Sequence, residues 1–398
     1  MDDKTRLPLD ILYTLAESLA ISGELSSLKA ASLTCKDFHR ICESHIFAEV
    51  DLTPEDRPVI ERFKKLLDTK PEVATFVHVV RVFLDPPHSP DLPIILSSMK
   101  AIRRLHLAIR SPSVAWTEIP PLVRSSIETA IRTPTLTHLE IRTLDQFPIT
   151  QIIAPPLSLT SLVLYSVPPP PGLYSDDLSP TLALSYRAIQ LRSLTILHLS
   201  MGACLALISQ KQSDGSPAVD LRQLEVLNID MEDKEGLLRL LLEDYERLKC
   251  LSICVNRNVP MSGTLNAMKR HTKETLQSLS LELHDVVGED CDPFLGLCEE
   301  LNSFPSSSAL RRINVQLFVM DDCDCSTRLE DWSAFDEVLQ GGKFSLLNDV
   351  SLSVNIVRYW NTDTSLETKL KDLAKSAFSR LKHADEIQFR YLVFVHTE

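Results

Sequence analysis

Glycine is scarce in this chain, with 10 residues in 398, about a third of the share that proteins average. Loops that cradle phosphate groups need closely spaced glycines, and neither G-x-x-x-x-G-K-[ST] nor G-x-G-x-x-G occurs. The hydrolase signatures G-x-S-x-G and H-E-x-x-H are absent as well. The sequence therefore disfavours nucleotide chemistry of those two kinds, and we expect no enzyme activity, no cofactor and no metal.

Long hydrophobic runs and excess positive charge are also missing. No apolar stretch approaches the roughly 18 residues of a membrane span, and the N-terminus MDDKTRLPLD has no apolar region typical of a signal peptide. The net charge of −13 disfavours nucleic acid as a partner. Nine scattered cysteines, an odd number, favour reduced thiols. We expect a soluble intracellular protein, cytoplasmic or nuclear, that binds neither membrane nor nucleic acid.

The sequence does contain an internal repeat, in which the pattern apolar-x-x-apolar-x-apolar occurs eleven times. The last two apolar positions alternate as in a short strand with one buried face, and the first enters the same core from the preceding turn. Successive occurrences begin 23 to 37 residues apart. Their first positions are Val77, Ile102, Leu136, Leu159, Leu194, Leu224, Leu248, Leu276, Leu310, Leu347 and Ala384.

Helix-like segments separate these strands, and residues 121–133, 234–248 and 365–381 are the clearest. Thr364 and Glu367 have capping-box spacing before the last of them, and Gly341 follows another apolar-periodic run as a helix C-cap would. One strand–turn–helix unit cannot bury its own apolar face, so the units are expected to stack on one another.

The repeated unit resembles the leucine-rich repeat family. That family usually places Asn or Cys three residues after the third apolar position, and Asn256 and Asn355 stand there in this chain. The expected fold class is an α/β solenoid, an irregular leucine-rich-repeat-like array over residues 73–398. An ordinary α/β domain with leucine-rich strands is the alternative.

The N-terminal segment predicts three short helices before this array. Pro8 suits the first turn of the first helix, and Gly23 ends it. Ser26 or Ser27 is expected to cap the second helix, and Thr34 the third. So small a unit has a marginal core and normally needs a partner or a neighbouring domain to cover its remaining apolar surface. The first helix carries its apolar face on Leu9, Leu12, Leu15, Ala16 and Leu19.

Residues 5–52 resemble the F-box, fungal members in particular. The family opens on L-P-x-E-[IL]-[IL], matched by Leu7–Leu12 with aspartate in place of the commoner glutamate. A second block, L-x-x-[AC]-S-L-[VT]-C-[RK]-x-[FW], is matched by Leu28–Phe38, where Phe38 stands in place of the tryptophan of many members. The closing His45–Phe47 is similar to fungal members.

The resemblance implies an F-box that docks on the Skp adaptor of a Skp–cullin–F-box ubiquitin ligase. Residues 53–72 would form a connecting helical segment, and the repeats would hold an unknown substrate protein for ubiquitin-dependent degradation. For Leu33 and Phe38, a place in the core beneath the interface is an equal alternative to direct contact. The expected adaptor-contact residues are Leu7, Pro8, Ile11, Leu12, Leu15, Leu33 and Phe38.

Two other functions compete with this hypothesis. The N-terminal helices could merely cap a leucine-rich-repeat interaction scaffold that has no ligase role, since such arrays need atypical terminal units. An enzyme on an unrecognised α/β fold would instead show a deep pocket with convergent ionisable groups.

Three further motifs favour ordinary structural roles. We expect the Pro-rich stretch 167–173 to be a rigid loop rather than a polyproline ligand. The acidic stretch 321–326 is expected to be a solvated loop, since C-x-C alone is a weak metal signal. Cys250 and Cys254 fall on one face of a strand and are interpreted as small buried hydrophobes.

Overall fold

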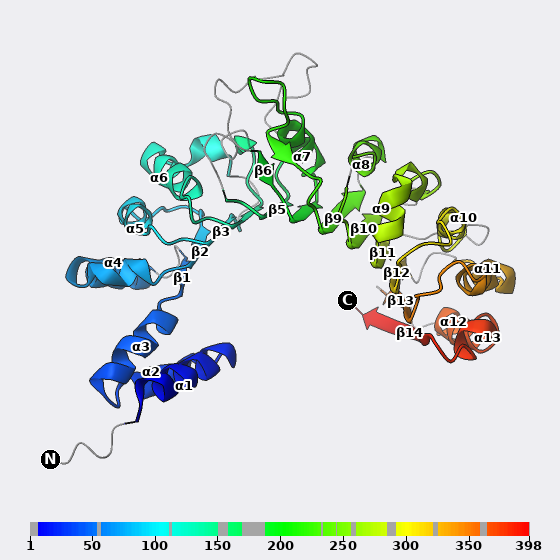
Figure 1. The fold of residues 1–398 in the computed structure, drawn as a ribbon, viewed down its shortest axis with the longest axis horizontal. Helices are drawn as coiled ribbons and strands as arrows, with labels where there is room; N and C mark the ends of the chain where they lie inside the picture. Colours follow the sequence, from blue (N-terminus) through cyan, green and yellow to red (C-terminus); the bar gives the residue numbers. More distant parts are fainter. Residues whose placement is uncertain are drawn as a thin grey trace. The chain divides into compact units, whose positions relative to one another are not determined.

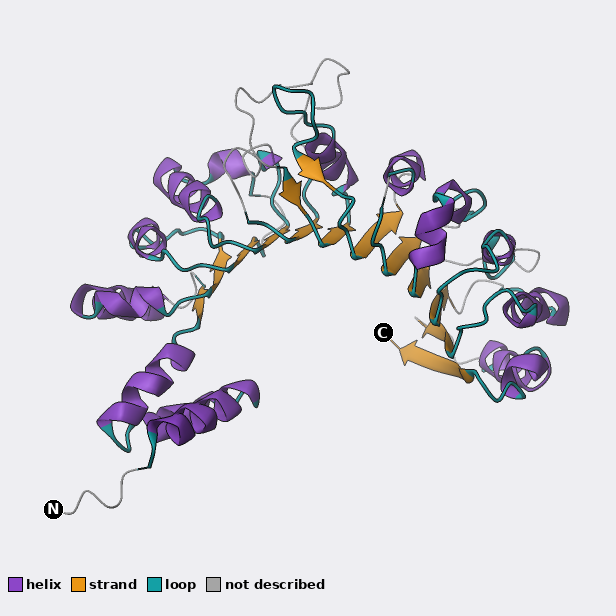
Figure 2. Ribbon diagram, in the orientation of Figure 1, coloured by secondary structure: helices purple, strands orange, loops and turns teal. Residues whose placement is uncertain are grey.

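The structure, a computed structural model, divides into two compact units. Unit 1 comprises residues 1–189 and 206–218, and unit 2 comprises residues 190–205 and 219–398. Each unit contains a parallel β-sheet with helices on one of its faces (Figures 1 and 2). The expected leucine-rich-repeat-like α/β array preceded by three helices is therefore confirmed. The structure describes residues 7–53, 57–110, 114–149, 158–168, 188–231, 234–243, 245–255, 260–284, 292–320, 325–358 and 364–397.

Unit 1 begins with helices α1 (Leu9–Ile21), α2 (Leu25–Ser32) and α3 (Lys36–Ile46). Pro8 occupies the N-cap position of α1, and Gly23, with φ +73°, follows its C-cap. A positive φ costs a glycine little, so this residue ends the helix as expected.

The caps of the next two helices differ from the sequence prediction. Helix α2 begins directly after Glu24, before either predicted serine, and the hydroxyl of Ser27 donates to the Glu24 carboxylate at 2.8 Å. The cap of α3 is Cys35, whose Sγ accepts a hydrogen bond from the Phe38 N–H. Thr34 does not cap α3, because its hydroxyl donates a hydrogen bond to the Ala31 carbonyl of the preceding helix.

The sheet of unit 1 runs β1-β2-β3-β4-β5, and each neighbouring pair of these strands is parallel. Its core face is built by apolar rows such as Val80, Leu105, Leu139 and Leu162, which stand in register and are buried. The strands are β1 (Glu49–Leu52), β2 (Val79–Phe83), β3 (Arg104–Ala108), β4 (His138–Arg142) and β5 (Ser161–Tyr165).

Strand β1 was not predicted, although Phe47-x-x-Val50-x-Leu52 fits the repeat pattern, because the segment was assigned to the N-terminal helical unit. It lies within residues 5–52 yet pairs with β2, so the sheet begins before the expected start of the array at residue 73. The helical segments of unit 1 lie on one side of this sheet (Figure 2). They are α4 (Arg57–Thr69), η3 (Pro71–Thr75), α5 (Leu92–Ser98), η4 (Trp116–Glu118) and α6 (Pro121–Ile131).

The sheet of unit 2 runs β7-β9-β10-β11-β12-β13-β14 and is also parallel. Leu227, Leu251, Leu279, Ile313 and Val350 form one buried row across it. Its strands are β7 (Ser193–Leu197), β9 (Val226–Met231), β10 (Cys250–Val255), β11 (Ser278–Leu283), β12 (Arg312–Met320), β13 (Asp349–Arg358) and β14 (Gln388–Thr397).

Helices cover one face of this second sheet (Figure 1). They are α8 (Lys234–Leu241), η6 (Leu265–Ala267), α9 (Arg270–Thr275), α10 (Leu297–Asn302), α11 (Leu329–Gln340), α12 (Ser365–Ser376) and α13 (Ser379–Lys382). The predicted helical segment 234–248 is helical only as far as Leu241, and the predicted segment 365–381 forms the two helices α12 and α13. The chain crosses between the two units within residues 189–220. The elements of this stretch are β6 (Ile189–Gln190), α7 (Met201–Ile208) and β8 (Val219–Asp220).

An aromatic cluster fills the core of unit 2 towards its C-terminal end. Trp332 is fully buried, and its indole N–H donates to the Ser326 carbonyl at 2.9 Å. The ring meets Phe294 edge to face at 5.5 Å and lies near Phe378 and Tyr391. Aromatic edge-to-face pairs add to the stabilisation from burial, so this cluster anchors the last helices on the sheet.

The predicted register is right for nine repeats and wrong for two. In β7 the buried pair is Leu194 and Ile196, in register with Leu227 and Ile229, whereas the predicted Leu199 is exposed. The pattern there begins three residues earlier than expected, at the buried Leu191.

In β14 the residue beside Val350 is Phe389 rather than the predicted Ile387, a shift of two residues. A shift of two keeps the same face inward. The alternating apolar residues of this strand therefore fit either register.

Other local predictions have mixed outcomes. Gly341 is the C-cap of α11 as expected, and Thr364 is the N-cap of α12 but makes no side-chain capping bond. Asn355 lies within β13, not in a turn, and His396 lies 3.1 Å from its Oδ1. Asn256, residues 169–173 of the Pro-rich stretch and residues 321–324 of the acidic stretch lie outside the described residues. Among the described residues, no helix is long and apolar enough to cross a membrane.

Candidate partner-binding surfaces

The three N-terminal helices share a small apolar core. Helices α1 and α2 both pack on α3, and half-buried Leu19, Ala20, Ala31 and Ile46 surround the centre. Such a core provides little stabilisation compared with the long rows of the sheets. Its buried members are Leu12, Ala16, Leu28, Phe38, Ile41 and Cys42.

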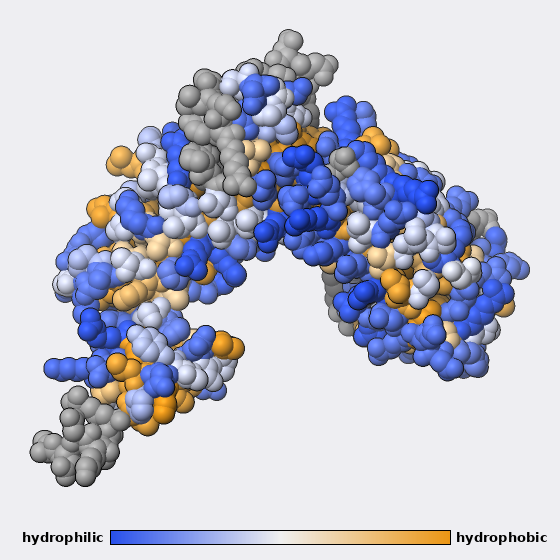
Figure 3. All heavy atoms as spheres, viewed as in Figure 1, coloured by the Kyte–Doolittle hydropathy of each residue, from blue (hydrophilic) through white to orange (hydrophobic). Residues whose placement is uncertain are grey.

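Most of the predicted adaptor-contact residues lie outside this core. Leu33 is 85% exposed, Leu7 57%, Leu15 44% and Ile11 42%, and Pro8 is exposed beside them. Figure 3 shows hydrophobic residues gathered on the surface of the helical segment. Large apolar side chains normally leave water on folding, so a concentration of them on a few short helices indicates a binding surface.

The remaining two predicted contact residues, Leu12 and Phe38, are core residues, with 6% and 9% exposure. They pack beneath the exposed apolar residues and are not accessible for direct contact with a partner. Sequence reasoning did not name several members of the exposed set, and the apolar face that it predicted for the first helix included Leu9 and Leu15, which are exposed. The additional exposed apolar residues are Leu9, Tyr13, Ile21 and Leu25.

A hollow of about 510 Å³ lies beside Leu33, at the junction of α2 and α3. Its lining combines this leucine with Cys35 and the basic or titratable side chains of Lys36, His39 and Arg40. His39 lies 3.7 Å from Glu43, which also pairs with a lysine. An apolar centre with a basic rim suits a partner that presents an apolar side chain flanked by carboxylates.

The helical segment is attached to the first strands of unit 1 at its C-terminal end. The ring of Phe47 lies 6.5 Å from that of Phe63 in α4, and Lys70 pairs with Glu43 at 2.9 Å. Strand β1 follows α3 after two residues. These contacts fix one end of the segment and leave the exposed apolar residues of α1 free of packing.

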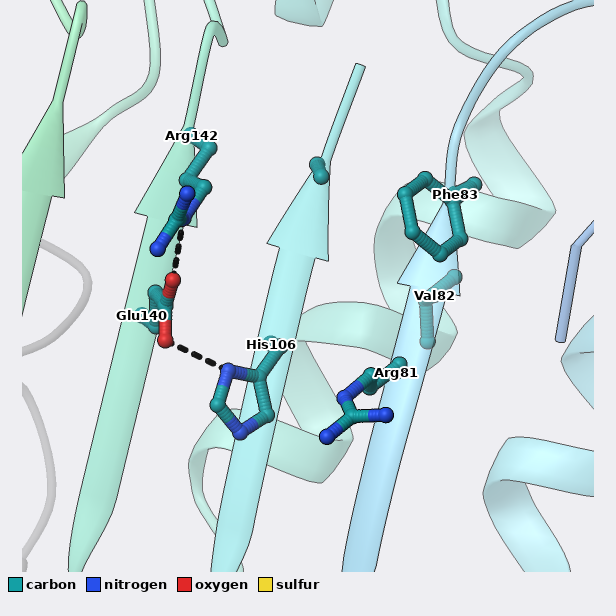
Figure 4. Close-up of a pocket in the computed structure, with 7 residues that line it drawn as sticks. Arg81, Val82, Phe83, His106, Glu140 and Arg142 are labelled. Carbon is teal, nitrogen blue, oxygen red and sulfur yellow. Dashed lines mark hydrogen bonds and ion pairs between the residues drawn. The ribbon is translucent and has the colours of Figure 1, made fainter. Parts of the chain in front are cut away.

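The second candidate surface is the face of each sheet that carries no helices, which we call the open face. In unit 1 this face holds a hollow of about 310 Å³ above β2, β3 and β4 (Figure 4). His106 points towards Glu140, with 2.5 Å between Nδ1 and Oε2, and Arg142 donates to the other carboxylate oxygen. Arg81 pairs with Glu49 on the neighbouring strand.

These contacts fix the charge state of Glu140. The hydrogen bond from His106, reinforced by Arg142, lowers the pKa of the carboxyl to about 2, although burial acts in the opposite direction. A general base works best with a pKa near the operating pH, so this carboxylate is poorly suited to proton transfer. The open face of unit 1 instead presents fixed charges of both signs beside Phe83, over which Arg110 lies at 4.3 Å.

The open face of unit 2 carries small uncharged polar side chains as well as charged pairs such as Arg312–Asp349 and Arg390–Asp349. Asn228 donates to Thr195 at 3.1 Å, and Asn314 donates to Ser280 at the same distance. Cys250 and Cys254 share this face as the spacing predicts, but both are half-buried. Their interpretation as buried hydrophobes is therefore wrong, because the face they occupy is not covered by helices.

No protein-family model and no curated protein matches the sequence. Among solved structures, the leucine-rich repeat-containing protein LegL7 from Legionella pneumophila is similar, with 11% identity and a TM-score of 0.40. The alignment covers 88% of this chain and 90% of that protein.

Proposed function

We propose that this chain is the substrate-recognition subunit of a Skp–cullin–F-box ubiquitin ligase. Helices α1–α3 dock on the Skp adaptor, and the repeat units bind the protein to be ubiquitinated. The observation that carries the proposal is the exposure of Leu7, Pro8, Ile11, Leu15 and Leu33 over a core made by Leu12 and Phe38. The same residues occupy the positions at which the segment resembles the F-box.

The energetics of this surface favour a stable partner. Fully burying a leucine or isoleucine side chain contributes about 1.5–3 kcal/mol. Hot spots in interfaces are a few such side chains at the centre of a buried patch. Ile11 and Leu15 lie one helical turn apart on α1, so a single partner surface can cover both.

The role of the chain in the ligase is to bring proteins together rather than to catalyse. A substrate held on an open face would lie at high effective concentration relative to the ubiquitin-loaded enzyme elsewhere in the assembly. The charged open face of unit 1 suits a substrate segment with charges of both signs, since complementary charges determine specificity and association rate.

A pull-down with the purified Skp adaptor tests the proposal. The full chain is compared with an Ile11→Asp/Leu15→Asp double variant and with Leu122→Asp, a matched control on α6 whose leucine is 76% exposed. Circular dichroism checks that all three fold. We expect the intact chain and the Leu122→Asp control to bind, and the double variant to lose binding. A folded intact chain that does not bind the adaptor would overturn the proposal.

An interaction scaffold without ligase role is the second candidate, and the contacts Phe47–Phe63 and Glu43–Lys70 favour it. If the helices only cap the repeats, the Ile11→Asp/Leu15→Asp variant behaves as the intact chain in every binding assay. Phe47→Ala would then act through stability alone, because it removes the contact of the cap with Phe63 of α4.

A further inference from the structure

Three side chains with different metal-binding atoms meet on the open face of unit 2. They are Cys254 at the end of β10, Glu282 in β11 and His284 directly after β11. The cysteine sulfur, a carboxylate oxygen and a ring nitrogen all lie within 4.8 Å of one another, and each residue is half-buried. Neither the proposed adaptor surface nor the hollow of unit 1 includes them.

The sheet register brings these residues together. Cys254 and Glu282 are direct partners across the parallel pair β10–β11. Glu282 and His284 are two residues apart, so strand alternation places them on the same face. The backbone N–H of His284 donates to the Val255 carbonyl at 2.8 Å, which continues the ladder past the last strand residue.

The imidazole of His284 is held in place from one side. Its ring stacks on Phe318 of β12, with 4.2 Å between the centroids and an interplanar angle of 4°. Nε2 lies 3.8 Å from a Glu282 carboxylate oxygen. A ligand whose orientation is already fixed by its neighbours loses less conformational freedom when a metal binds.

Glu282 is suited to be a ligand as well. It stands directly across from Cys254 in the β10–β11 register, and one of its carboxylate oxygens lies 3.8 Å from His284 Nε2. On the other side of β10, Asp230 is the register partner of Cys254. Its carboxylate accepts a hydrogen bond from the His198 backbone N–H at 3.1 Å and is not among the three clustered ligand groups. The cluster therefore consists of one sulfur, one nitrogen and one oxygen ligand.

We infer that Cys254, Glu282 and His284 bind one Zn²⁺ ion, with the fourth coordination position open to water. Zinc accepts thiolate, imidazole and carboxylate ligands in a tetrahedron, whereas Mg²⁺ and Ca²⁺ prefer oxygen ligands throughout. Tetrahedral bonds of ordinary length place neighbouring ligand atoms about 3.3–3.6 Å apart. The 3.8 Å between His284 and Glu282 is already close to that spacing.

The cluster was not predicted from the sequence, which was expected to hold no metal. Cys254 and Glu282 are 28 residues apart and show no common zinc-ligand spacing. The signal appears only when the repeats beginning at Leu248 and Leu276 are aligned. Each residue then falls at the sixth position after its own repeat begins, and the two share a row of the sheet.

Titration of the reduced full chain with Co²⁺ tests the inference, because cobalt replaces zinc in such sites and reports thiolate ligation by an ultraviolet charge-transfer band. Wild type is compared with Cys254→Ser and His284→Gln. Cys250→Ser is the matched control, since Cys250 lies on the same strand and face and is also half-buried. Circular dichroism confirms the fold of each variant.

We expect one equivalent of Co²⁺ to produce the band in wild type and Cys250→Ser, and one equivalent of Zn²⁺ to abolish it. Cys254→Ser should lose the band, and His284→Gln should bind Co²⁺ at least tenfold more weakly. A wild-type chain without the band, or a Cys254→Ser variant that keeps it, would overturn the inference. Adaptor binding is measured separately, so failure of one proposal leaves the other standing.

Discussion

The repeat units bury their apolar side chains, whereas the N-terminal helices leave many of theirs exposed. Rows such as Leu227, Leu251 and Leu279 are almost completely buried under the helices of their own unit. Helix α1 instead buries Leu12 and Ala16 and exposes five large apolar side chains. The repeats complete their own core, whereas the helical segment leaves large apolar side chains exposed, as a binding surface would.

The largest expected effect is in the core of the repeats. Trp332→Ala should lower the free energy of unfolding of unit 2 by about 3–5 kcal/mol, because it removes a fully buried ring and an indole hydrogen bond. Urea unfolding of the full chain, followed by circular dichroism, measures the shift. Trp332→Phe is the control and should cost clearly less. A loss below about 1 kcal/mol would contradict a self-sufficient repeat core.

A similar truncation in the helical segment should have a local effect. Phe38→Ala removes the largest side chain of a six-residue core and should cost about 3 kcal/mol, enough to open α1–α3. Limited proteolysis should then cut between residues 9 and 46 while the strands of unit 2 stay resistant. Phe394→Ala, at an exposed phenylalanine of β14, is the control. Cleavage spread equally over the repeats would remove the distinction between the two regions.

Substitution at the exposed surface should separate binding from stability. Leu33→Asp should change the free energy of unfolding by less than about 0.5 kcal/mol, because the side chain is 85% exposed. Affinity for the Skp adaptor should fall about tenfold or more, as for a buried interface residue. Calorimetric titration measures it, with Leu122→Asp as the control. Equal affinities of Leu33→Asp and wild type would exclude this leucine from the interface.

The smallest expected effect concerns the charged open face of unit 1. The pKa of Glu140 is about 2 in the folded chain, below its ordinary value of 4.5, so ionised Glu140 stabilises the fold above pH 4.5. This stabilisation, about 1–2 kcal/mol after solvent screening, is lost as the pH falls from 4.5 towards 2. Glu140→Gln should be less stable than wild type at pH 7, and the difference should shrink below pH 4.5. A difference that is constant with pH would contradict the ion-pair network.

The sequence predicted the buried rows because strand alternation repeats them. The prediction was wrong where the alternation of apolar residues fits two registers equally well. Leu191-x-x-Leu194-x-Ile196 and Leu194-x-x-Leu197-x-Leu199 fit the same pattern, and only pairing of Leu194 with Leu227 decides between them. In β14 the alternating apolar side chains allow any shift of two residues.

The candidate surfaces were predictable to different degrees. The F-box resemblance named contact residues on the helical segment without separating those that face outward: Leu12, named as a contact, is buried, and Phe38, for which a core place was an equal alternative, is buried too. The cluster of Cys254, Glu282 and His284 depends on pairing between repeats 28 residues apart, which no local pattern in the chain reveals.

Hydrogen exchange of the full chain, with and without purified Skp adaptor, tests the central claim most directly. Alone, the amides of α1–α3 should exchange faster than those of β10, β11 and β12, because their core is smaller and their surface is uncovered. With the adaptor, protection should rise within residues 9–46 and stay unchanged in those strands. Unchanged exchange in α1–α3, or protection confined to the repeats, would contradict the adaptor-docking account.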